Sequence, residues 1–125
     1  MGDTIWVDVE GRRSGDVPAD NSIILRLEKQ LAQLSNRLRV SKLADFYAYE
    51  SGWLQKWRWF DPAKALAAIN TIYDHLQHSP DDLGFEPTAS RLHWQDLLMK
   101  ELLECRRVLE AAVSTGKKFR FLIVS

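Results

Sequence analysis

The two ends of the chain carry the alternation of apolar and polar residues that is typical of half-buried β-strands. Residues 4–10 and 117–125 each follow this period of two, and both segments are predicted as strands. Their alternating apolar residues are Ile5, Val7 and Val9 in the first segment and Phe119, Phe121 and Ile123 in the last. Two strands separated by helices most simply pair with each other, so the helices must then cover one face of the pair.

Between the two strands the apolar residues recur every three or four positions, which is the spacing of amphipathic helices. This pattern predicts long helices over about residues 23–39, 62–77 and 90–115, and a short helical turn within residues 41–50. Capping residues stand at the predicted helix ends: Asp20 or Ser22 before the first helix, Asp61 and Pro62 at the start of the second, and Gly116 after the third.

This order of elements predicts an α+β protein dominated by helices, in which a three-helix layer packs on a small β-ribbon formed by the N- and C-terminal strands. A length of 125 residues corresponds to a single domain, residues 1–125. Residues 11–22 show no periodicity and are predicted as a mobile loop. Leu122 and Val124 are apolar on the face of the last strand opposite Phe121, so a second copy that extends the sheet through an exposed edge is one option.

The composition argues against several classes of protein. Seventeen basic residues balance seventeen acidic ones, so the chain lacks the overall positive field that attracts nucleic acid or anionic lipid. Cys105 is the only cysteine, which excludes an intrachain disulfide, and its helical apolar surroundings predict a buried, inert thiol. No apolar run approaches the roughly 20 residues of a membrane span, and the first residues lack a signal-peptide pattern. We therefore expect a soluble cytoplasmic protein that binds neither membrane nor nucleic acid.

Residues 49–60 gather large aromatic side chains and cations: Trp53, Lys56, Trp57, Arg58 and Trp59. This mixture is found at protein interfaces, in single-stranded nucleic-acid sites and in membrane-interface belts, and the same rings can close a small core. Trp53 and Trp57 share a face only in a helix, whereas Trp57 and Trp59 share one only in an extended segment. We therefore expect part of this segment to be buried and the rest to form an interaction surface.

One pattern suggests metal-dependent chemistry, because imidazole and carboxylate groups are ligands of zinc and iron. Its residues are His75, His78, His93, Asp81 and Asp82. The competing interpretation is that the first two histidines simply end the second helix, since the spacing lacks the glutamate and second ligand of an H-E-x-x-H signature.

Two weaker candidates complete the search for sites. Glu101 and Glu104 lie three residues apart on the last predicted helix, as paired carboxylates do in magnesium sites, but the other helices offer too few partners. Arg12 and Arg13 provide a weak contact for an anion. The sequence thus predicts a noncatalytic protein-interaction or regulatory module without a cofactor, whose partner is another protein or a second copy in a homodimer. The alternative is a small hydrolase or metal-dependent enzyme that uses the histidines and aspartates.

Overall fold

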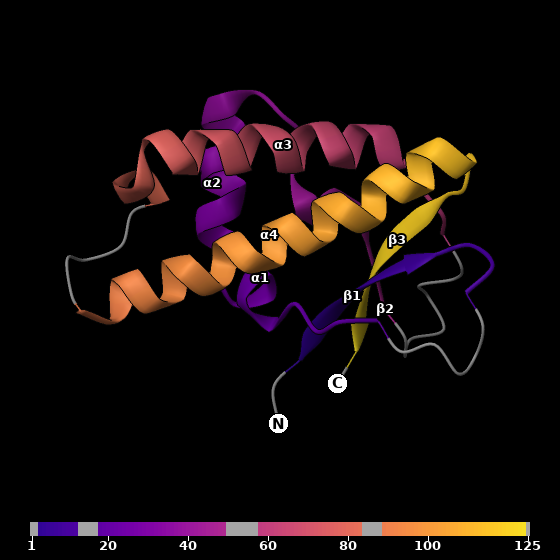
Figure 1. Ribbon diagram of the computed structural model, residues 1–125, viewed down its shortest axis with the longest axis horizontal. Coiled ribbons are helices and arrows are strands. Elements are labelled where there is room, and N and C mark those ends of the chain that lie inside the picture. The colour runs from indigo at the N-terminus through magenta and orange to yellow at the C-terminus, as the bar shows by residue number, and fades with distance from the viewer. Residues whose placement is uncertain (1–2, 13–17, 50–57, 84–88, 125) are drawn as a thin grey trace.

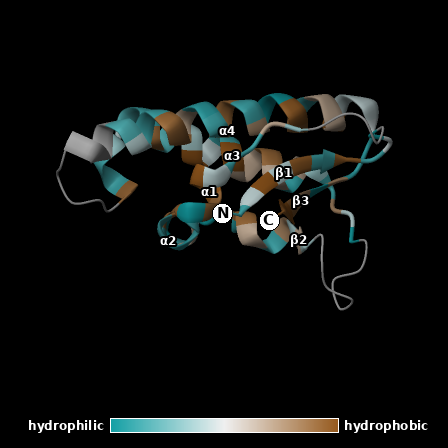
Figure 2. Ribbon diagram, turned by 90° about the horizontal axis from the view of Figure 1, so that it is seen from below, coloured by the Kyte–Doolittle hydropathy of each residue, from teal (hydrophilic) through white to brown (hydrophobic). Residues whose placement is uncertain are grey.

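Two long helices cross the molecule side by side (Figure 1), and a small sheet with two short helices lies on one side of them (Figure 2). The computed structural model describes residues 3–12, 18–49, 58–83 and 89–124. In chain order the elements are β1 (Thr4–Val9), α1 (Ser22–Arg26), α2 (Glu28–Leu38), the 3₁₀ helix η1 (Leu43–Phe46), β2 (Tyr47–Tyr49), α3 (Pro62–His78), the 3₁₀ helix η2 (Pro80–Leu83), α4 (Ala89–Thr115) and β3 (Phe119–Val124). The predicted class, a helix-dominated α+β fold, is confirmed.

The sheet has three strands in the order β1-β3-β2, so the last strand of the chain lies in the centre. β1 and β3 are antiparallel, with Ile5 opposite Ile123 and Val9 opposite Phe119. The predicted pairing of the two terminal strands is therefore confirmed.

The third strand corrects the prediction of a helical turn over residues 41–50. Only Leu43–Phe46 are helical, whereas Tyr47–Tyr49 form β2 and run parallel to β3. A strand of three residues is too short to show a period of two, so its state depends on the neighbouring strand more than on its own pattern. Ala48 lies opposite Leu122 of β3 and is buried.

The first predicted helix is in fact two helices, α1 and α2, which meet at Leu27 (φ −98°, ψ 18°). Neither Asp20 nor Ser22 caps α1, because Asn21 holds the N-cap position and its side chain makes no capping hydrogen bond. Instead, the carboxylate of Glu101 accepts hydrogen bonds at this helix start from across the molecule. A tertiary contact therefore replaces the predicted local cap.

The two long helices begin and end as predicted. Asp61 Oδ1 accepts a hydrogen bond from the Ala63 N–H at 3.0 Å, and Pro62 is the first residue of α3. α4 ends before Gly116, whose φ of 68° lies in the left-handed region that glycine adopts without strain. α3 and α4 run in opposite directions and pack along much of their length (Figure 1).

The core lies between the long helices and one face of the sheet. In Figure 2 the strands and the short helices α1 and α2 lie on the same side of α3 and α4. The rings of Phe119 and Phe121 are buried beneath the helices with their centres 5.1 Å apart, and Phe46 lies 5.5 Å from Phe119. Leu122 and Val124, on the opposite face of β3, are also buried. Within the described residues, no helix is both long and apolar enough to cross a membrane.

Candidate functional site

The aromatic and cationic segment predicted as an interaction surface lies only partly within the described residues. The three of its predicted residues that lie outside them are Trp53, Lys56 and Trp57. Arg58 is exposed, and its guanidinium carbon lies 5.5 Å from the centre of the Phe60 ring. Trp59 is half-buried, and the guanidinium carbon of Arg120 lies 4.4 Å from its ring centre. Trp59 therefore makes a cation–π contact within the fold.

A buried carboxylate holds two guanidinium groups on the face of the sheet opposite the long helices. Asp8 is 3% exposed, and its Oδ2 accepts a hydrogen bond from Arg120 Nε at 2.8 Å. Its Oδ1 accepts from Arg12 Nε at 2.7 Å. Arg12, one of the two arginines predicted to contact an anion, thus binds a carboxylate of its own chain, and Arg13 lies outside the described residues.

The structure brings His75 and Asp82 of the predicted metal cluster into contact. His75 Nε2 lies 2.6 Å from Asp82 Oδ2, and Arg37 Nη1 donates to Asp82 Oδ1 at 2.9 Å. Hydrogen bonds from Arg37, which has the larger effect, and from His75 lower the pKa of the Asp82 carboxyl. The arrangement links α2, α3 and η2, and the guanidinium already supplies the positive charge that a metal ion would bring.

The other members of this cluster have separate surroundings. His78 Nδ1 lies 2.8 Å from the backbone carbonyl of Asp74, one turn back in α3, as expected for a residue that ends a helix. His93 is exposed on α4, and Asp81 is exposed on η2. Among the described residues, no group of three or more His, Cys, Asp or Glu side chains is arranged to hold a metal ion.

The carboxylates Glu101 and Glu104 serve different contacts. Glu101 Oε1 accepts from the N–H groups of Ile23 at 3.0 Å and Ile24 at 2.9 Å. Burial raises the pKa of the Glu101 carboxyl, although these two hydrogen bonds act in the opposite direction. Glu104 forms an ion pair with Arg107 one turn further along α4, and the hydrogen bonds from this guanidinium lower the pKa of its carboxyl.

Cys105 lies in the core, as its helical apolar pattern predicts. It is fully buried, and this burial raises the pKa of its thiol. A thiol nucleophile must be accessible and ionised. This cysteine therefore contributes packing only.

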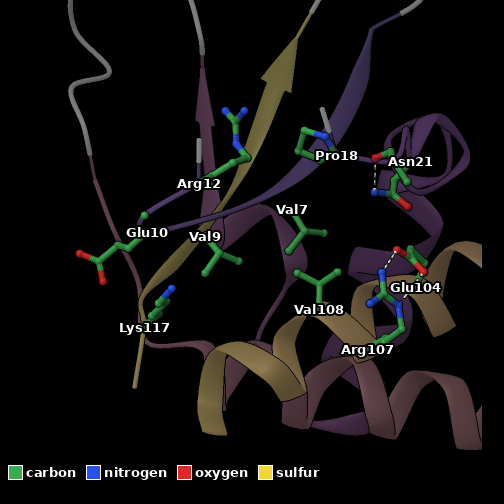
Figure 3. A pocket seen from close by; sticks show the side chains of 12 residues that line it. Val7, Val9, Glu10, Arg12, Pro18, Asn21, Glu104, Arg107, Val108 and Lys117 are labelled. Atoms are coloured by element: carbon green, nitrogen blue, oxygen red, sulfur yellow. Dashed lines mark hydrogen bonds and ion pairs between the residues drawn. The ribbon is translucent and has the colours of Figure 1, made fainter. Parts of the chain in front are cut away.

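A pocket of about 430 Å³ lies beside β1, between that strand and α4. Val7 and Val9 of β1 and Val108 of α4 line its middle, and Pro18 lines it from the segment that follows β1 (Figure 3). Figure 3 shows Lys117 and Glu10 toward one end, with Asn21 and the Glu104–Arg107 pair toward the other. We call this pocket the β1–α4 groove.

Along β1, the backbone N–H and C=O groups point alternately toward β3 and toward the groove side of the strand. The Glu10 N–H donates to the Lys118 carbonyl at 3.0 Å, so the backbone N–H and C=O of Glu10 point toward β3. In an antiparallel pair the direction alternates, which turns the N–H and C=O groups of Ile5, Val7 and Val9 away from β3. β1 is therefore an edge strand along the groove.

At each end of this edge, a backbone carbonyl already accepts a hydrogen bond. The Asn21 N–H donates to the Ile5 carbonyl at 3.1 Å, and the Arg12 N–H donates to the Val9 carbonyl at 3.2 Å. Within the described residues, the N–H and C=O of Val7 have no hydrogen-bond partner. The middle of the edge therefore offers a donor and an acceptor to a ligand.

The charges of the groove are mostly paired within the fold. Arg107 binds Glu104, Arg12 binds Asp8, and the Glu10 carboxylate accepts a hydrogen bond from the Lys118 N–H at 2.7 Å. Among the described residues, no ion pair involves the ammonium group of Lys117 or the carboxylate of Glu10, whose hydrogen bond comes from a neutral backbone N–H. A Cβ placed on Gly11 would lie 3.5 Å from Lys117 Nζ, so this cation stands beside the turn that follows β1.

Sequence reasoning missed the groove, although it identified β1 correctly. The alternation in β1 marked Val7 and Val9 as residues of a buried face. It carried no information about which strand neighbours β1 on each side, and the groove exists because β3 pairs with only one edge of β1. No family model, curated protein or solved structure matches the chain.

Proposed function

We propose that this protein is a noncatalytic interaction module that binds an extended segment of a partner protein in the β1–α4 groove. The observation that carries the proposal is the open middle of the β1 edge, where the N–H and C=O of Val7 lack partners among the described residues. Addition of a strand to such an edge satisfies these groups through main-chain hydrogen bonds. A volume of about 430 Å³ is typical of a site for a small ligand or a short segment.

The walls of the groove favour a single extended segment over a second folded copy of the chain. α4 borders the β1 edge on one side through Val108, and residues 18–21 border it on the other. Another folded domain would have to insert its own edge strand between these walls. A single extended segment needs less room than a folded domain, so it is the occupant that we propose.

The lining of the groove supports binding and offers little for catalysis. None of the described residues that line it is a serine, threonine, cysteine or histidine, the usual nucleophiles and general bases of enzymes. Its two carboxylates, Glu10 and Glu104, already accept hydrogen bonds within the fold. The proposal therefore favours an interaction module over the enzyme alternative.

Substitution of Val108 by Trp tests the proposal, because the larger side chain would fill the groove from α4. Leu103→Trp is the matched control, since Leu103 is 39% exposed on the same helix and does not line the groove. The probe is a displayed library of random octapeptides selected on the wild-type protein. We expect a selected peptide to bind wild type and Leu103→Trp equally, and Val108→Trp at least about tenfold more weakly by fluorescence polarisation.

Two results would contradict the proposal. One is selection of no peptide, or equal binding of the selected peptide to wild type and Val108→Trp when circular dichroism shows both to be folded. The other is a wild-type dimer in sedimentation equilibrium that Val108→Trp converts to a monomer, because the occupant would then be a second copy of the chain.

A further inference from the structure

We draw no further inference here: the strongest candidate, the pocket between the start of α3 and the end of α4 that is lined by Asp61, Val113 and Lys118, combines a helix N-terminus with surface lysines, and nothing among the described residues shows which ligand would occupy it.

Discussion

At the scale of single residues, Asp8 is a buried carboxylate that holds two guanidinium groups. Its carboxylate is almost fully buried and contacts Arg120 Nε at 2.8 Å and Arg12 Nε at 2.7 Å. Removal of an ion from water is costly, and a buried pair balances this cost only when both partners are present. Removal of the carboxylate alone would leave the guanidinium of Arg120, which is 8% exposed, without its shared counter-charge.

We therefore predict that Asp8→Ala lowers the free energy of unfolding by about 3 kcal/mol. The double substitution Asp8→Val with Arg120→Leu should recover most of this loss, because it removes both charges and keeps β-branched or apolar side chains in the sheet. Urea denaturation followed by circular dichroism measures both values. A double variant as unstable as Asp8→Ala would show that lost packing, and not an uncompensated charge, is responsible.

At the scale of secondary-structure elements, α1 depends on a side chain from α4. Glu101 accepts hydrogen bonds from the first N–H groups of α1, which has no side-chain cap of its own. We predict that Glu101→Ala lowers the free energy of unfolding by about 1 kcal/mol, the usual value of a helix cap. Glu110→Ala is the control on the same helix, since its contact with Arg106 is long, at 3.7 Å, and largely exposed. An equal effect of both substitutions would argue against capping.

The same carboxylate gives the stability a dependence on pH. Burial raises the pKa of Glu101 in the folded protein above its ordinary value of 4.5, so the folded state holds this proton more tightly than the unfolded chain does. The corresponding stability is present below pH about 4.5 and is lost as the pH rises through the folded pKa. We predict that wild type loses stability relative to Glu101→Gln as the pH rises from about 4 to 7. Urea midpoints across this range measure the difference, and a constant difference would contradict the prediction.

At the scale of the whole molecule, local and distant contacts should form at different stages of folding. α3 and α4 are consecutive and antiparallel, whereas β1 pairs with β3 from the opposite end of the chain, with Ile5 opposite Ile123. Closure of a long loop costs entropy before the distant contacts compensate for it. We predict φ-values above about 0.5 for Ile69→Ala and Leu102→Ala, and below about 0.3 for Ile5→Ala. Stopped-flow chevron plots provide these values. The opposite ranking would show that the sheet forms first.

Patterns that depend on neighbouring residues could be predicted from the sequence, and those that depend on distant partners could not. The terminal strands, the start of α3 at Asp61 and the end of α4 at Gly116 follow from periodicity and capping chemistry. The break at Leu27 and the strand β2 do not, because the first depends on how α1 and α2 pack and the second on the free edge of β3. The β1–α4 groove also depends on distant partners, and no sequence motif indicated it. Residues 50–57, part of the predicted interaction surface, lie outside the described part of the chain.

By itself, the sequence determined the class of the fold, the pairing of its terminal strands and the position of the long helices, because alternation and helical spacing are local consequences of burying one face. The tertiary structure alone decided that β3 lies in the centre, that Glu101 caps α1 and that the N–H and C=O of Val7 have no partner among the described residues. The physical reason is that backbone hydrogen bonds are nearly the same for every residue. The sequence shows where a strand lies, but only the packed molecule shows which of its edges has a partner.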